Sequence, residues 1–174
     1  MDYERIQNSA SIAKLLRGDG GFALPSDLVC GMYIFVGLGR PLYVGISQDP
    51  VFRVHQHLGL ADAWSYYRYP HPELGTPIGR LVHTFRPDSL DWRVYFPSAA
   101  DVANYMNAYP HTMRDDYEAD YSIFAFAERY LIYELNCPVN SAHSRRGDGN
   151  RDFWELVWAR EGTPDKSAGD YLNL

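Results

Sequence analysis

The chain has 174 residues, of which 46% are hydrophobic and 15% aromatic, enough for one domain with a genuine core and too little for two domains of usual size. Its net charge of -6 argues against indiscriminate binding of polyanions, because non-specific affinity for nucleic acid rests on the neutralisation of many phosphates. No stretch reaches membrane-spanning length. Cys30 and Cys137 lack the spacing of zinc ligands, and with no signal-peptide pattern in the sequence we expect reduced thiols in a cytoplasmic protein.

The first predicted elements are an N-terminal helix and a β-hairpin. The helix covers residues 4–17 and ends at Gly18. Runs of β-branched and aromatic residues at 32–36 and 42–46 predict two strands, and the glycine- and proline-containing segment 37–41 predicts the turn between them.

The hairpin is expected to bring two tyrosines together. If its turn is symmetric about Leu38, Tyr33 lies directly opposite Tyr43. Cross-strand partners on one face of a sheet have Cβ atoms about 4.5 to 5.5 Å apart. We therefore expect two phenol groups side by side.

A short helix is predicted after the hairpin. Asp49 is a strong N-cap acceptor, Pro50 suits the first helical position and Gly59 suits the end of the helix. Arg53 and His57 are separated by four residues on this helix. Side chains at that spacing share a face, so a guanidinium and an imidazole point the same way.

The second half of the chain is predicted to be mostly helical. The aromatic segment 64–72 contains Arg68. Aromatic residues interleaved with arginine can stack on bases or pack over the core, and because few basic residues surround the segment we favour packing. The segment 91–96 is predicted to be a strand that can join the hairpin as a third. Helices are predicted at 78–84, 98–109, 123–135 and 152–160, the last with Phe153, Trp154, Val157 and Trp158 on the side that docks against the core.

An acidic cluster in this half is a weaker candidate site. It consists of Asp115, Asp116, Glu118 and Asp120. Carboxylates in a group can bind a cation, but charge runs are more often solvated surface, which is the interpretation we favour.

Glu128 is the most informative polar residue of the predicted helix 123–135. It lies in the apolar stripe, four residues after Phe124. A carboxylate on an apolar face is costly unless it is paired or binds a metal, so Glu128 is either a metal ligand or a residue at the edge of the stripe that reaches water. Asn140 follows at the start of an extended segment, where the alternative to a functional role is an ordinary turn asparagine.

These residues resemble the GIY-YIG nuclease family. The first family motif reads Gly31-Met32-Tyr33 in this chain and the second reads Tyr43-Val44-Gly45. Further along, the positions that correspond to the rest of the family pattern are Ser47, Arg53, His57, Glu128 and Asn140. The departure from the pattern is the long stretch between His57 and Glu128, which implies an insertion.

The resemblance implies a domain organisation and a fold. The whole chain is expected to be a single domain, 1–174, with a GIY-YIG-like core at about 29–141, an insertion within 61–120, an N-terminal helix within 1–28 and a C-terminal helical extension at 142–174. The predicted fold class is α+β: a small, mainly antiparallel three-stranded sheet flanked by helices.

The resemblance also implies a function. The expected activity is metal-dependent hydrolysis of phosphodiester bonds, with DNA as the favoured substrate and with 5′-phosphate and 3′-hydroxyl products. Glu128 would hold a single Mg²⁺ or Mn²⁺ and Arg53 would clamp a phosphate oxygen, while one tyrosine activates water and His57 is the alternative proton acceptor. The implied catalytic set is Tyr33, Tyr43, Arg53, His57, Glu128 and Asn140.

Two other functions stay open at this point. One is a catalytically silent module on the same fold that binds nucleic acid or a protein, and the acidic net charge leaves room for a protein partner. The other is a toxin-type nuclease, which shares the chemistry. The presence of all the motif residues favours catalysis.

Overall fold

The structure is a computed structural model that describes residues 1–17, 31–59, 76–107, 120–140 and 150–162. Several predictions lie outside the described residues: the aromatic segment 64–72, Cys30, and the acidic cluster from Asp115 to the side chain of Asp120. The division of the chain into core, insertion and extensions stays a prediction.

The protein is α+β, as predicted, and its sheet is antiparallel. Strands β2 (Gly31–Gly37) and β3 (Arg40–Ser47) form the predicted hairpin. Strand β4 (Arg93–Tyr95) pairs with the other edge of β2, as expected for a third strand. Within the described ranges the sheet has four strands where three were predicted, in the order β1-β4-β2-β3, because β1 (Ser9–Ser11) pairs with β4.

The prediction of one N-terminal helix was wrong. The structure divides that segment into a 3₁₀ helix η1 (Tyr3–Arg5), strand β1 and a short helix α1 (Ile12–Arg17). Serine and asparagine side chains compete with the helical backbone for hydrogen bonds, which favours caps and extended segments. Ser11 illustrates this, because its Oγ accepts a hydrogen bond from the Lys14 amide at 3.3 Å, at the start of α1.

The other predicted helices are present. Helix α2 begins with the Asp49 cap, whose carboxylate accepts from the Phe52 amide at 2.9 Å, and is followed by Gly59 at φ +77°. The helices are α2 (Pro50–His57), α4 (Pro77–Thr84), the 3₁₀ helix η3 (Asp88–Asp91), α5 (Ala99–Asn107), α6 (Asp120–Glu134) and α7 (Arg151–Glu161). No helix within the described ranges is long and apolar enough to cross a membrane.

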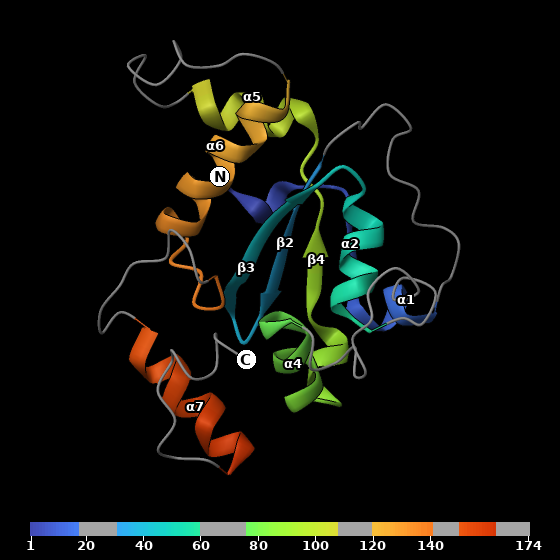
Figure 1. Ribbon diagram of the computed structural model, residues 1–174, viewed down its shortest axis with the longest axis vertical. Helices are drawn as coiled ribbons and strands as arrows, with labels where there is room; N and C mark the ends of the chain where they lie inside the picture. Colours follow the sequence, from blue (N-terminus) through green and yellow to red (C-terminus); the bar gives the residue numbers. More distant parts are fainter. Residues whose placement is uncertain (18–30, 60–75, 108–119, 141–149, 163–174) are drawn as a thin grey trace.

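Helices cover both faces of the sheet and create two apolar cores (Figure 1). Successive strand residues point to opposite faces. Tyr33 and Phe35 of β2 therefore join the core formed with α1, α2, α4 and α7, while Met32 and Ile34 join the core formed with α5 and α6. Helix α7 docks as predicted, through buried Phe153, Trp154 and Val157 and partly buried Trp158.

The register of the hairpin corrects one prediction about the tyrosines. Tyr33 pairs with Gly45, and Tyr43 pairs with Phe35. The ladder shifts after Phe35, and Leu42 is the extra residue of a β-bulge. Tyr33 and Tyr43 are therefore diagonal neighbours and not directly opposite.

Candidate active site

The glycines of both motifs have steric roles at the site. A Cβ at Gly45 would lie 2.4 Å from the Tyr33 hydroxyl oxygen. Because Gly45 has no side chain, the Tyr33 ring can lie across β3 at this position. A Cβ at Gly31 would lie 2.7 Å from Cγ of Pro50, so this glycine lets the first turn of α2 approach the sheet. The two glycines thus place a tyrosine and a helix.

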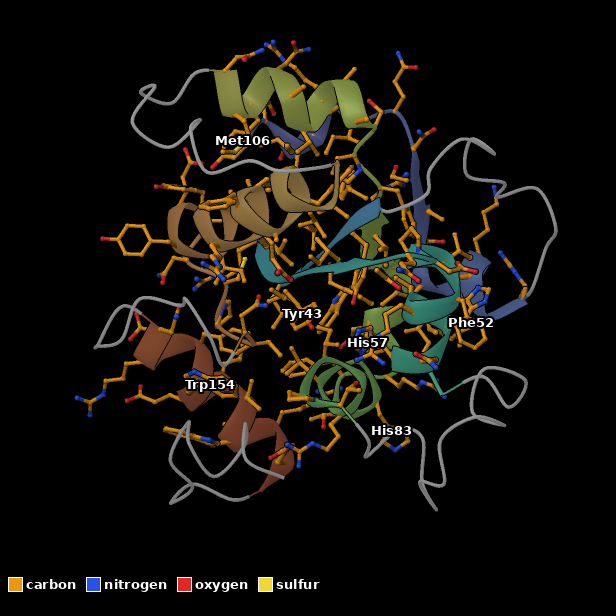
Figure 2. The ribbon with its side chains drawn as sticks, turned by 45° about the horizontal axis from the view of Figure 1, so that its top comes forward. Tyr43, Phe52, His57, His83, Met106 and Trp154 are labelled. Carbon is orange, nitrogen blue, oxygen red and sulfur yellow. The ribbon has the colours of Figure 1, made fainter. Side chains whose placement is uncertain are left out.

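Two tyrosines and a histidine form a compact cluster on the face of the sheet covered by α2. The Tyr33 hydroxyl is 3.0 Å from Nε2 of His57, and these side chains are 1% and 2% exposed. The Tyr43 ring is stacked on the Tyr33 ring, with centroids 6.2 Å apart, and its centroid is 5.4 Å from that of His57. Figure 2 shows Tyr43 and His57 lying together between β3 and α2.

Arg53 approaches the same cluster from α2. Its Nη1 donates to Oε1 of Gln56 at 2.9 Å, and its guanidinium also donates a hydrogen bond to Tyr33. Gln56 is 3% exposed, and its hydrogen bond fixes the position of the Arg53 guanidinium. We did not predict this role for Gln56, although its position three residues after Arg53 on a helix was a usable signal.

Glu128 belongs to α6, on the opposite face of the sheet, and its charge acts on both tyrosines of the cluster. Helix α6 packs on the other core through Phe124, Ala127 and Leu131, while the Glu128 carboxylate accepts a hydrogen bond from the backbone of Ile46 in β3. Because β3 is the last strand of the sheet, its outer backbone groups are available to such a side chain. The negative charge of Glu128 is near enough to raise the pKa of Tyr43.

Asn140 braces the same outer edge of β3. Its Oδ1 accepts from the Val44 amide at 3.0 Å and its Nδ2 donates to the Val44 carbonyl at 2.8 Å. The Val139 amide donates to the carbonyl of the bulge residue Leu42 at 3.1 Å. The residue after Tyr43 is thus fixed by a side chain that behaves like a neighbouring strand, and Asn140 acts on the motif backbone.

Burial keeps the acid–base groups of the site uncharged. Desolvation raises the pKa of Tyr33 well above its usual value, and the neighbouring Tyr43 adds to this, against the lowering effect of Arg53. Desolvation also raises the pKa of Tyr43. For His57, desolvation followed by the Arg53 charge lowers the pKa to about 3.

Glu128 is subject to the same balance. Desolvation raises the pKa of its carboxyl group, while Arg129 and the Ile46 hydrogen bond lower it. Within the part of the chain that the structure describes, no three His, Cys, Asp or Glu side chains are grouped as a metal site. Among the described residues, Glu128 is the carboxylate that the sequence predicts as the ligand of a cation at this site.

Thr76 is a second residue that we did not predict. Its Oγ1 is 3.1 Å from Nδ1 of His57, on the side of the ring away from Tyr33. Thr76 precedes Pro77 and is the N-cap of α4, which the sequence signals, but nothing in the sequence connects it with His57.

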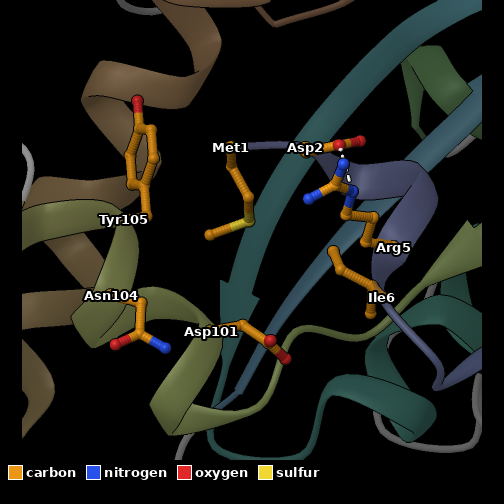
Figure 3. Close-up of a pocket in the computed structure, with 7 residues that line it drawn as sticks. All are labelled: Met1, Asp2, Arg5, Ile6, Asp101, Asn104 and Tyr105. Atoms are coloured by element: carbon orange, nitrogen blue, oxygen red, sulfur yellow. Dashed lines mark ion pairs between the residues drawn. The ribbon is translucent and has the colours of Figure 1, made fainter.

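The structure also contains a hollow of about 250 Å³ between η1 and α5 (Figure 3). Among its lining residues, Asp2 and Arg5 form an ion pair at 2.9 Å. Ile6 and Tyr105 of the lining belong to the core on the α6 face. The hollow is therefore separate from the tyrosine–histidine cluster.

No protein-family model, curated protein or solved structure matches the chain. The resemblance to GIY-YIG nucleases therefore depends on the motif residues. Five of the six predicted site residues are close enough to contact one another or to shift one another's pKa: Tyr33, Tyr43, Arg53, His57 and Glu128. The sixth, Asn140, hydrogen-bonds to the backbone of Val44 in β3.

Proposed function

We propose that this chain is a metal-dependent nuclease of the GIY-YIG type, with DNA as the favoured substrate and with 5′-phosphate and 3′-hydroxyl products. Strands β2, β3 and β4 would be the nuclease core, to which β1 is added. The observation that carries the proposal is the contact of the buried Tyr33 hydroxyl with His57 Nε2 at 3.0 Å. The charges of Arg53 on α2 and Glu128 on α6 both act on this tyrosine.

Phosphodiester hydrolysis needs three things that these residues can supply. A water oxygen forms a bond to phosphorus as its proton leaves, the bond from phosphorus to the 3′ oxygen breaks, and that oxygen takes up a proton from solvent water. Negative charge grows on the phosphoryl oxygens during this exchange. A proton acceptor, a fixed cation and a ligand for a metal cofactor are therefore expected together.

Glu128 suits a cofactor of the Mg²⁺ or Mn²⁺ class. Mg²⁺ keeps several waters and needs only one or two protein carboxylates together with substrate phosphates. A carboxylate accepts about four hydrogen bonds or metal contacts, so the bond from Ile46 leaves Glu128 able to bind a cation. When bound, the cation would supply positive charge beside a phosphoryl oxygen and the leaving oxygen.

Arg53 is suited to grip a second phosphoryl oxygen. The guanidinium is planar and carries five N–H donors, and Gln56 engages only one nitrogen in the contact at 2.9 Å. A donor that is fixed before the substrate arrives needs no reorganisation as charge develops. Arg53 is expected to contribute more to turnover than to binding.

Tyr33 and His57 are the proposed proton path. The water proton would pass to the Tyr33 oxygen while the Tyr33 proton passes to Nε2 of His57. The low pKa of His57 in the free protein makes it a weak acceptor there, but a bound phosphate brings negative charge, which raises the pKa of a nearby imidazole. The relay is thus favoured when the substrate is present.

The test is incubation of the purified protein with labelled single- and double-stranded DNA and RNA, with Mg²⁺, Mn²⁺ or EDTA, followed by analysis of the product ends. We expect metal-dependent cleavage that leaves 5′-phosphates. Binding without cleavage under every condition would favour the silent binding module. A toxin-type nuclease would give the same cleavage, so a separate test of growth inhibition in expressing cells identifies that setting.

A further inference from the structure

Thr76 connects the start of α4 to the imidazole of His57. Its Oγ1 accepts a hydrogen bond from the Gly79 amide at 3.1 Å, which is the usual N-cap bond, and lies 3.1 Å from His57 Nδ1. One hydroxyl therefore serves both the end of a helix and the ring that contacts Tyr33.

Gly79 makes this close approach possible. A Cβ at position 79 would lie 2.2 Å from the His57 carbonyl oxygen and 2.9 Å from Thr76 Oγ1. Any other residue would push the first turn of α4 away from the end of α2. The segment from Thr76 to Gly79 is thus shaped to the backbone and the side chain of His57.

Both ring nitrogens of His57 are engaged, so the position of the single proton on the neutral ring decides what each contact does. Arg53 already donates to the Tyr33 oxygen. If Nε2 carries a lone pair, the Tyr33 hydroxyl can donate its single proton to His57 while its oxygen accepts from Arg53. If Nε2 carries the proton, two donors meet the Tyr33 oxygen and its own proton cannot move to His57.

We propose that Thr76 is a positioning residue that accepts a hydrogen bond from Nδ1–H of His57 and so holds the imidazole in the tautomer whose Nε2 lone pair faces Tyr33. This inference rests on the proposed nuclease function. In the relay, the Tyr33 proton moves to Nε2, the water proton replaces it on Tyr33, and the imidazolium keeps its Nδ1–H bond to Thr76. Thr76 itself exchanges no proton and touches no substrate.

The tautomer can be read from the ¹⁵N spectrum of the His57 ring, because protonated and unprotonated imidazole nitrogens have well-separated shifts. We expect a protonated Nδ1 and an unprotonated Nε2 in the wild-type protein at neutral pH, and the same in Thr76→Ser, which keeps the hydroxyl. In Thr76→Val we expect a mixture of tautomers. A wild-type spectrum with the proton on Nε2 overturns the proposal without any variant.

Kinetics supply the second measurement. We expect kcat of Thr76→Val to fall about 10- to 100-fold with KM unchanged, less than the loss of an entire general base, and Thr76→Ser to restore it. Ser98→Ala is the matched control, because Ser98 accepts from the Asp101 amide at 3.1 Å in the first turn of α5 and so tests the loss of a cap away from His57. Its kcat should be unchanged.

The two proposals fail in different ways. If Thr76→Val keeps the wild-type tautomer, or if Ser98→Ala loses as much kcat as Thr76→Val, the role of Thr76 is wrong. If no substrate is cleaved by the wild-type protein but Thr76→Val changes the tautomer, the nuclease function is wrong and the role of Thr76 in fixing the ring is supported.

Discussion

The two faces of the sheet differ in the kind of side chain that they bury. On the face covered by α6, Met32, Ile34 and Val44 are all 0% exposed and pack against apolar helix residues. On the other face, Tyr33 at 1% and His57 at 2% exposure place a hydroxyl and an imidazole in the core. A buried polar group is costly unless it has a hydrogen-bond partner, and Tyr33 and His57 partner each other at 3.0 Å. One face thus buries apolar strand residues, while the other contains buried polar groups that depend on one another as partners.

The outer edge of β3 is where the two faces meet. Asn140 closes part of that edge, and Glu128 reaches it from α6. An unpaired strand edge usually needs protection from other strands. Here the protection also brings the charge of a carboxylate close enough to act on Tyr43.

The largest effect is expected for Glu128→Gln. Loss of the carboxylate proposed to hold the cation should reduce cleavage by more than about 10³-fold, since a catalytic metal contributes several kcal/mol to the transition state. Thermal melting reports whether the fold is intact. Glu155→Gln in α7, at an exposed ion pair with Arg151, is the control with activity unchanged. Cleavage by the wild-type protein in the presence of EDTA would contradict the proposed metal dependence.

Tyr33→Phe and Tyr43→Phe should come next. Phenylalanine keeps the ring and removes only the hydroxyl, and we expect losses of about 10² to 10⁴-fold, larger for Tyr33 because it contacts His57 at 3.0 Å. Tyr133→Phe, on an exposed side chain of α6, should be fully active. If both tyrosine variants cleave normally while His57→Ala is inactive, His57 alone is the base.

Arg53→Lys tests the fixed cation. Lysine keeps the charge but lacks the planar fork, so we expect kcat to fall about 10²-fold and substrate affinity to change much less. Single-turnover rates and equilibrium binding separate the two quantities. Equal losses in both would make Arg53 a docking residue.

Asn140→Ala tests the brace on the edge of β3. It leaves the Val44 amide and carbonyl without the bonds at 3.0 and 2.8 Å, at a cost of about 1 to 3 kcal/mol for each unsatisfied group. Urea denaturation should show a lower midpoint with the same slope. Asn104→Ala, at an exposed position of α5, should change stability by less than about 0.5 kcal/mol.

The smallest predicted effect is an acid sensitivity due to His57. Its pKa is about 3 in the folded protein and about 6.5 in the unfolded chain, so the unfolded chain binds more protons between these values and stability falls as the pH falls. The contribution is about 1 kcal/mol between pH 6.5 and 5.5. His57→Gln should lose this part of the pH dependence, measured as the difference from the wild-type unfolding curves. An unchanged slope would mean that His57 is already charged in the folded protein.

Local signals in the sequence predicted the hairpin, α2 with its Asp49 cap, and the shared face of Arg53 and His57, because each depends on neighbours along the chain. The prediction that Tyr33 and Tyr43 lie directly opposite each other was wrong, since the bulge at Leu42 is coupled to a hydrogen bond from distant Val139. Strand β1 was missed because its partner β4 is far along the chain. Thr76 was missed for the same reason, since only the packing of α4 on α2 brings it to His57.

We propose that the buried polar cluster serves chemistry and not stability. The most direct test replaces both partners of its hydrogen bond in the double variant Tyr33→Phe, His57→Leu, and measures unfolding and DNA cleavage on the same preparation. Removing both partners together can be nearly neutral or stabilising, so we predict an unfolding free energy within about 1 kcal/mol of the wild-type value, or above it, and no cleavage. A variant that unfolds several kcal/mol more easily and still cleaves DNA would contradict the claim.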